Sequence, residues 1–155
     1  MSYFILGLKP EVCECSFLTY QEREVSLGNR TFRYFVIPQE PRLPHFVLRM
    51  TGDNSDGHVL GIADSVDERY RPYAVAHEFI EFTEIGIEEP ERCIRALEEE
   101  IELVPENIRK SYLSMRRDFF RDLIGYCSQQ PEHYTQHDLE QFRQNFIRLE
   151  ELLKQ

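Results

Sequence analysis

Residues 58–86 read HVLGIADSVDERYRPYAVAHEFIEFTEIG, and this stretch contains the change from strand to helix on which the fold depends. Its beginning, HVLGIA, has the short apolar character of a β-strand, whereas residues 73–86 carry apolar side chains at the spacing of an α-helix. The chain before this change is strand-like and the chain after it is helical. We therefore expect a single α+β domain over residues 1–155, strand-rich in 1–66 and helical in 69–155.

Five segments of the first half are expected to be strands, because they are rich in β-branched and aromatic residues and are bounded by turn signals. Gly28-Asn29 is such a signal before the third segment, and the polar residues 51–57 form another before the fifth. The connections are short, so we predict an antiparallel sheet. The five segments are residues 2–8, 13–20, 30–37, 45–50 and 58–63.

About four helices are predicted in the second half, separated by residues 86–90, Pro105 and residues 128–131. The last, over residues 135–154, begins at a capping box of Thr135 and Asp138. Its apolar side chains recur every three or four residues, so this helix must pack on something. Either it packs on its own domain or it forms a dimer or a seam with a partner protein. The stripe consists of Leu139, Phe142, Phe146, Leu149 and Leu153.

The formal charge of −10 argues against nucleic-acid binding, which depends on Lys and Arg side chains that displace counterions from phosphates. The apolar segments are far shorter than the ~20 residues that cross a bilayer, and no signal-like start is present. We therefore expect a soluble cytoplasmic protein without a membrane partner. In that compartment the four cysteines are expected to be reduced thiols buried as small apolar side chains. They are Cys13, Cys15, Cys93 and Cys127.

The helix over residues 73–86 has one apolar face and one face that carries a histidine and several glutamates. His77, Glu81 and Glu84 are spaced i, i+4, i+7, which stacks three potential metal ligands along one side of a helix. Glu78 is turned by roughly 100° from His77, where it can reach a water molecule near the same ion. The alternative is that these residues form the solvent-exposed face of an ordinary amphipathic helix.

The segment His77-Glu78-x-x-Glu81 resembles the HExxH helix of the zinc metallopeptidases called zincins, with Glu81 in place of the second histidine. In one subclass of the glutamate-ligand branch, the gluzincins, the third ligand is a glutamate on the following helix, eighteen residues further on. Residues 82–99 provide such a spacer. The resemblance covers about residues 58–104 and implies His77 and Glu100 as metal ligands, Glu81 as a substituted ligand and Glu78 as the general base.

The pattern of the next helix agrees with an inward position for Glu100, because this residue lies at the border of the apolar stripe. Glu99 and Glu102 point away from that stripe. The stripe consists of Cys93, Ile94, Leu97, Ile101 and Val104.

A ligand set of one histidine and two glutamates would neutralise a divalent ion, which makes the ion a weaker Lewis acid than in a good hydrolytic zinc site. Such a set also favours harder ions such as manganese, iron or calcium over zinc. Two functions therefore remain in competition. One is a zincin-like metal-binding domain with weak or degenerate hydrolase or peptidase activity. The other is a non-enzymatic adaptor or regulatory domain that acts through its C-terminal helix and acidic surface.

Overall fold

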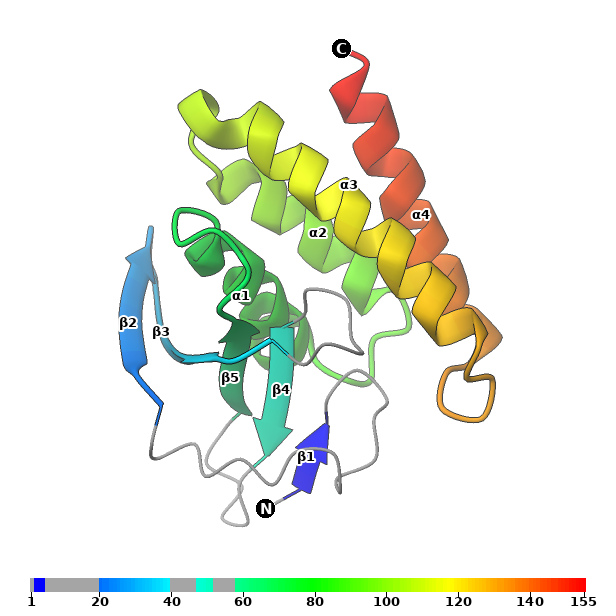
Figure 1. The fold of residues 1–155 in the computed structure, drawn as a ribbon, viewed down its shortest axis with the longest axis horizontal. Helices are drawn as coiled ribbons and strands as arrows, with labels where there is room; N and C mark the ends of the chain where they lie inside the picture. Colours follow the sequence, from blue (N-terminus) through cyan, green and yellow to red (C-terminus); the bar gives the residue numbers. More distant parts are fainter. Residues whose placement is uncertain (1, 5–19, 40–46, 52–57) are drawn as a thin grey trace.

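A computed structural model describes residues 2–4, 20–39, 47–51 and 58–155. It combines one β-sheet with four α-helices, which confirms the predicted α+β class. The sheet lies on one side of the molecule, and the helices cover one of its faces and extend away from it (Figure 1). The predicted strands and turns that fall on residues 5–19, 40–46 and 52–57 lie outside the described part of the chain, as do Cys13 and Cys15.

The sheet contains the strands in the order β1-β4-β5-β3-β2. Their bounds are Ser2–Phe4 for β1, Glu22–Leu27 for β2, Arg30–Ile37 for β3, Val47–Thr51 for β4 and His58–Ala63 for β5. Strand β5 is inserted between β3 and β4, where it pairs antiparallel with β4 and parallel with β3. The prediction of a fully antiparallel sheet is therefore wrong, because connection lengths do not reveal which strands become neighbours.

The predicted strands over residues 30–37, 45–50 and 58–63 correspond to β3, β4 and β5. The predicted set of five is not confirmed, since the first segment is described as a strand only over Ser2–Phe4 and the second lies almost wholly outside the described residues. Strand β2 was not predicted. Its sequence EREVSL lacks a clear apolar face because it is a largely exposed edge strand, held to β3 partly by an ion pair between Glu24 and Arg33.

The helices confirm the four segments that the sequence predicts after residue 69. Helix α1 begins at a proline-containing first turn and continues without a break into the π-helical turn η3, which ends at Gly86 with φ of +98°. The capping box of Thr135 and Asp138 is present at the start of the last helix. The bounds are Arg71–Phe79 for α1, Ile80–Ile85 for η3, Arg92–Leu103 for α2, Glu106–Ser128 for α3 and Gln136–Leu153 for α4.

Helix α1 is the central element, because it packs against β4 and β5 on one side and against α2 on the other. Helices α3 and α4 pack on each other, and α4 also contacts α2. In Figure 1, α1 accordingly lies between the sheet and the outer helices. The side chains of Ala74, Val75, Ala76 and His77 are all buried, so a polar group on this part of α1 must find its partners inside the protein.

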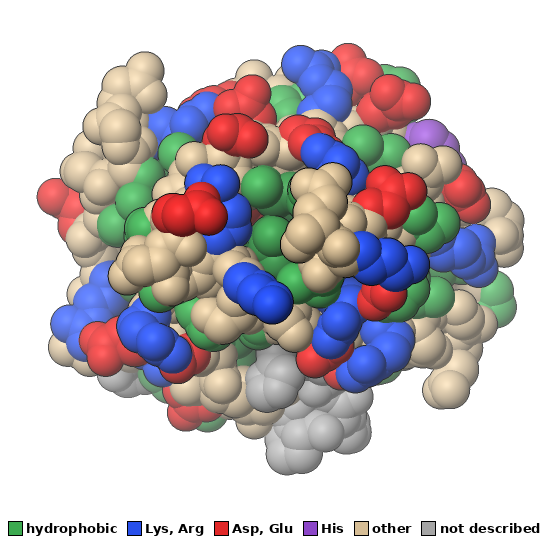
Figure 2. Space-filling model, turned by 90° about the horizontal axis from the view of Figure 1, so that it is seen from above, with side chains coloured by type: hydrophobic (Ala, Val, Ile, Leu, Met, Phe, Trp, Pro, Cys, Tyr) green, Lys and Arg blue, Asp and Glu red, His purple; other side chains and the backbone are tan. Residues whose placement is uncertain are grey.

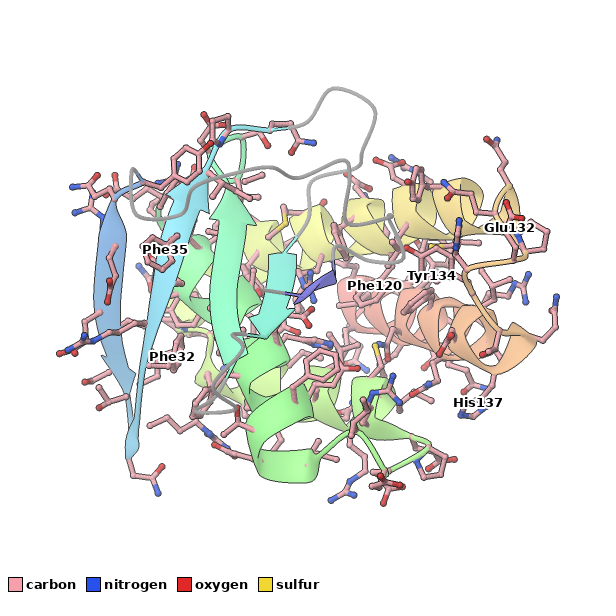
Figure 3. The ribbon with its side chains drawn as sticks, turned by 90° about the horizontal axis from the view of Figure 1, so that it is seen from below. Phe32, Phe35, Phe120, Glu132, Tyr134 and His137 are labelled. Carbon is pink, nitrogen blue, oxygen red and sulfur yellow. The ribbon has the colours of Figure 1, made fainter. Side chains whose placement is uncertain are left out.

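The apolar stripe of α4 packs on its own domain. Leu139 and Leu149 are buried, and Phe142, Phe146 and Leu153 pack against the core. The ring of Phe142 contacts Phe120 of α3 and Tyr134 of the connection before α4. Figure 3 shows Phe120 and Tyr134 on the helical side of the molecule, away from Phe32 and Phe35 of the sheet. Association of α4 with a second copy or another protein stays a prediction.

Most of the basic side chains of α3 pair with acidic groups of the same chain. Arg109 lies near Glu106, Arg117 near Asp118 and Glu150, and Arg121 near Asp118 and Asp122. On the face drawn in Figure 2, blue and red side chains are interspersed over the helical region. The acidic partners in these exposed or half-buried ion pairs belong to α3 and α4.

Within the described ranges, no helix has the length and apolar character needed to span a bilayer.

Candidate metal centre

His77 lies in the middle of the protein, with only 2% of its surface exposed. It belongs to α1, and its ring is covered on one side by Phe120 of α3, whose centroid is 6.4 Å away. A buried imidazole needs partners for both ring nitrogens, because an unsatisfied polar atom costs about 1–3 kcal/mol. Both nitrogens of His77 have such partners, and these partners come from different elements.

The Nδ1 edge of the ring faces Glu100 of α2. The Nδ1–H group donates to Oε2 of Glu100 over 2.9 Å, and Glu100 is fully buried. Two residues of α3 hold the same carboxylate: the hydroxyl of Tyr112 donates to Oε1, and the guanidinium of Arg116 forms an ion pair with Oε1 at 2.7 Å. Glu100 is therefore a compensated buried charge rather than an isolated one.

The Nε2 edge of the ring faces Glu81 and Cys93. Oε2 of Glu81 is 3.3 Å from Nε2, and Sγ of Cys93 is 3.6 Å from the same atom. One potential ligand atom from each of His77, Glu81 and Cys93 lies within 4.8 Å of the other two. Both Glu81 and Cys93 are buried, with 6% and 5% of their surface exposed. An imidazole nitrogen, a carboxylate oxygen and a sulfur thus converge on one enclosed point.

Glu81 reaches this point from the start of the π-helical turn η3. The wider turn is closed by the hydrogen bond from the backbone N–H of Gly86 to the carbonyl of Glu81, five residues earlier. Such turns inside α-helices cost hydrogen-bond geometry and are frequent at functional sites. The second carboxylate oxygen of Glu81 lies 3.2 Å from Nε of Arg92, so one oxygen faces His77 and the other faces a cation.

Cys93 is the second residue of α2, and two polar side chains of α4 fix its position. Its backbone N–H donates to Oε1 of Gln141 over 3.2 Å. Nδ2 of Asn145 lies 3.3 Å from both the carbonyl oxygen and Sγ of Cys93, and it donates toward them. Gln141 and Asn145 are buried although they belong to an otherwise apolar face. The sulfur is therefore held against His77 by α4 as well as by α2.

The pKa values describe the protonation of the metal-free site. Burial alone would lower the pKa of His77, but the hydrogen bonds with Cys93, Glu100 and Glu81 outweigh burial and hold this pKa well above its ordinary value. Burial raises the pKa of the Cys93 thiol to about 11. For Glu100, burial is opposed by the charges of Arg116 and His77, which keep its pKa below the ordinary value. The metal-free site therefore holds an imidazolium and a neutral thiol at neutral pH.

Glu78 lies next to this centre and is half-buried. Burial, together with the charge of Glu81, raises its pKa to about 8. The described residues contain no hydrogen bond or ion pair to its carboxyl group, in contrast to Glu81 and Glu100. A carboxyl group with these properties is protonated near neutral pH and gains the ability to exchange a proton in that range.

The structure brings together only part of the ligand set that the sequence suggests. His77 and Glu81 converge, whereas Glu100 lies at the opposite edge of the ring with both oxygens engaged, and its assignment as a ligand of the same ion stays a prediction. Glu84 extends outward and forms two hydrogen bonds with Arg30, because the angular spacing changes within η3. The sequence does not single out Cys93 as a potential ligand, because a small thiol in an apolar stripe has the pattern of an ordinary core residue.

The donor set fits a divalent ion of the zinc class. Zinc in proteins is bound by thiolate, imidazole and carboxylate groups, most often in a tetrahedral arrangement, and three such groups leave one position open. His77 presents Nε2 while its Nδ1–H is held by a carboxylate, which is the usual arrangement of a metal-binding histidine. The residues present therefore could hold such an ion.

His77 also lies between a thiol and a carboxylate, which is the arrangement of a nucleophile, a base and a group that orients the base. In that reading Cys93 would be the nucleophile, His77 the base and Glu100 the orienting carboxylate. Two observations argue against nucleophilic catalysis by this thiol. Sγ is enclosed, and burial raises the pKa of Cys93 to about 11, whereas reactive cysteines have lowered pKa values and partial access. Glu81 also competes with the thiol for Nε2. The arrangement is better suited to hold an ion.

His133 and His137 are four residues apart in the sequence, but they do not form a site of this kind. His133 precedes α4, and His137 belongs to its first turn, so they do not share one helix, as the position of the Thr135 cap predicts. Nε2 of His137 lies 2.5 Å from the carbonyl oxygen of Pro90 and is thus engaged in tying α4 to the start of α2. Figure 3 shows His137 at the end of the helical layer, remote from Phe32 and Phe35.

Comparison of the chain with protein-family models, with curated proteins and with solved structures finds no match.

Replacement of Glu78 by glutamine is expected to stabilise the protein in a pH-dependent manner. In the unfolded chain Glu78 loses its proton near the ordinary pKa of 4.5, whereas in the folded protein it keeps the proton up to about 8. The folded state therefore binds more protons in this window, and the wild-type protein loses stability as the pH rises through it. Glutamine stays neutral, so the advantage of Glu78→Gln grows from pH 4.5 to pH 8.

Thermal unfolding across this pH range checks the prediction, with the exposed Glu88→Gln as a control of equal charge change. We expect the midpoint of Glu78→Gln to exceed that of the wild type by several degrees at pH 8 and to match it near pH 4.5. A difference that does not vary with pH would contradict the raised pKa.

Proposed function

We propose that this chain is a metal-binding domain whose ion is held by His77, Glu81 and Cys93. The observation that carries the proposal is the convergence of three different ligand atoms within 4.8 Å inside the protein core. An accidental cluster of glutamates on a helix surface would be exposed, whereas His77, Glu81 and Cys93 are all buried. A histidine and a glutamate are seldom buried unless they are paired or bind an ion.

The sulfur ligand changes the metal that the site should select. With His77, Glu81 and Glu100 as ligands, the sequence favours manganese or iron, because hard carboxylates dominate that set. With Cys93 in place of Glu100, the set contains a soft thiolate, which favours zinc over magnesium, calcium or manganese. The combined charge of the divalent ion and its ligands is zero with either set, since a thiolate carries the same single negative charge as the carboxylate that it replaces.

A divalent ion can replace two protons of the metal-free site without changing the charge buried in the core. The metal-free site contains an imidazolium proton at Nε2 and a thiol proton on Cys93, because both groups have raised pKa values. A divalent ion that replaces these two positive charges leaves the total charge of the centre unchanged. Glu100 with Arg116, and Glu81 with Arg92, can then keep the ion pairs that they have in the metal-free protein.

Zinc titration followed by calorimetry tests this function. We expect the wild-type chain to bind one zinc ion, and we expect His77→Ala and Cys93→Ser each to weaken binding more than tenfold, because each removes a ligand. The matched control is His133→Ala, which removes an exposed histidine of the turn before α4. Absence of stoichiometric zinc binding by the folded wild type, or unchanged binding by His77→Ala, would refute the proposed centre.

A hydrolytic activity is the second candidate, and the state of Glu78 favours it. A bound zinc-class ion supplies a Lewis acid that polarises a carbonyl group. Glu78 is adjacent to His77 in the helix, and the described residues contain no hydrogen bond or ion pair to its carboxyl group, so once ionised it is available to accept a proton. The zincin resemblance assigns the same role to Glu78.

The adaptor function has less support from the described residues. Its main argument was the apolar stripe of α4, and that stripe is occupied by contacts with the same domain. The acidic surface is shared with basic side chains that form intramolecular ion pairs (Figure 2). No specific contact therefore favours this function over metal binding.

Hydrolysis of labelled casein by the zinc-loaded protein distinguishes an enzyme from a metal-binding domain without catalysis. If the second candidate is correct, Glu78→Gln should lower the rate by roughly 10²–10⁴-fold, because a proton acceptor is removed while all three ligands remain. Zinc affinity is measured in parallel and should change little. Equal rates in the wild type and Glu78→Gln would show that Glu78 is not the base.

A further inference from the structure

Glu100 contacts the imidazole of His77 at Nδ1, the ring nitrogen that does not face Glu81 and Cys93. Its Oε2 accepts the Nδ1–H group over 2.9 Å, on the edge of the ring opposite to Glu81 and Cys93. A ring with a proton fixed on Nδ1 presents its free electron pair at Nε2 once the second proton is lost. The contact therefore selects the tautomer that a metal ligand requires.

The carboxylate itself is held in place by α3. The Tyr112 hydroxyl donates to Oε1, while the Arg116 guanidinium contacts both oxygens, at 2.7 Å and 3.3 Å. Tyr112 and Arg116 are spaced i, i+4, so they reach Glu100 from the same face of α3. Both are buried, and neither contacts the ligand atoms of Glu81 or Cys93 in the described structure.

Aromatic packing prevents these two anchors from moving away. The ring of Tyr112 contacts Tyr70 and Tyr73 in edge-to-face geometry, with centroids 5.5 Å and 5.9 Å apart. The guanidinium of Arg116 lies over the rings of Phe119 and Phe120, at 4.9 Å and 5.0 Å. Rotation of Glu100 toward Nε2 would leave Arg116 as an uncompensated buried charge, which costs several kcal/mol.

We propose that Glu100 is a positioning residue of the metal centre, held by Tyr112 and Arg116 so that His77 directs Nε2 at the ion. This inference rests on the proposed function and makes α3 part of the site although it supplies no ligand. Partners of this kind behind a metal-binding histidine typically contribute 10- to 100-fold to metal affinity. Glu100 therefore contributes to metal affinity without coordinating the ion, whereas His77, Glu81 and Cys93 coordinate it.

The test compares Glu100→Gln with the wild type in two measurements. Zinc titration is expected to show one ion per chain in both proteins, with affinity lowered about 10- to 100-fold in the variant. The absorption spectrum of the cobalt-loaded protein is expected to be the same in both, because the ligand set is unchanged. The matched control is Glu99→Gln, which makes the same charge change on the preceding, exposed residue and should leave zinc affinity within about twofold.

Two results would overturn the assignment. Zinc affinity of folded Glu100→Gln within about twofold of the wild type would mean that Glu100 does not position His77. Loss of stoichiometric binding together with a changed cobalt spectrum would make Glu100 a ligand, as the sequence pattern suggests. Should Glu100→Gln fail to fold because Arg116 is left unpaired, Tyr112→Phe keeps the charge pair and should lower zinc affinity by roughly two- to tenfold, again with the cobalt spectrum unchanged.

Nitrogen NMR of His77 in the metal-free proteins separates this inference from the proposed function. We expect the Nδ1 signal of His77 to shift in Glu100→Gln and to stay unchanged in Glu99→Gln. A wild-type protein that takes up no zinc but shows this shift would refute the metal centre and leave the positioning contact intact. An unchanged His77 signal in Glu100→Gln would refute the positioning contact itself.

Discussion

A buried imidazole with acidic partners at both nitrogens is the constraint on which the helical part of this protein depends. Glu100 at Nδ1 and Glu81 with Cys93 at Nε2 can be buried only because each has a further partner. These further partners connect the four helices to one point. They are Tyr112 and Arg116 of α3, Arg92 at the start of α2, and Gln141 and Asn145 of α4. The packing of the helices therefore depends on the same contacts that set the chemistry of the centre.

Much of the site could be predicted from the sequence, because the relevant spacing lies within single helices. The i, i+4 relation of His77 and Glu81, and the inward position of Glu100 at the border of an apolar stripe, both follow from helical geometry. Which edge of the ring each carboxylate approaches depends on how α2 and α3 pack, and no local spacing encodes this. Cys93 was overlooked for another reason: a buried thiol has the same pattern as an alanine or valine.

The fold shows the same division between local and non-local information. Helix bounds and the cap at Thr135 follow from local signals and agree with the structure. Strand order does not, because β5 pairs with β3, which lies far earlier in the chain, and no local signal encodes such a pairing. Strand β2 was missed because an exposed edge strand carries charged side chains on both faces and loses the alternation that marks buried strands.

Anomalous diffraction from crystals grown with zinc shows whether the Nε2 edge of His77 binds a metal ion. We expect one strong peak about 2.0–2.3 Å from Nε2 of His77, Sγ of Cys93 and a carboxylate oxygen of Glu81, with Glu100 still bound to Nδ1. A zinc-free His77 in such crystals, or a peak coordinated by Glu100, would contradict this expectation.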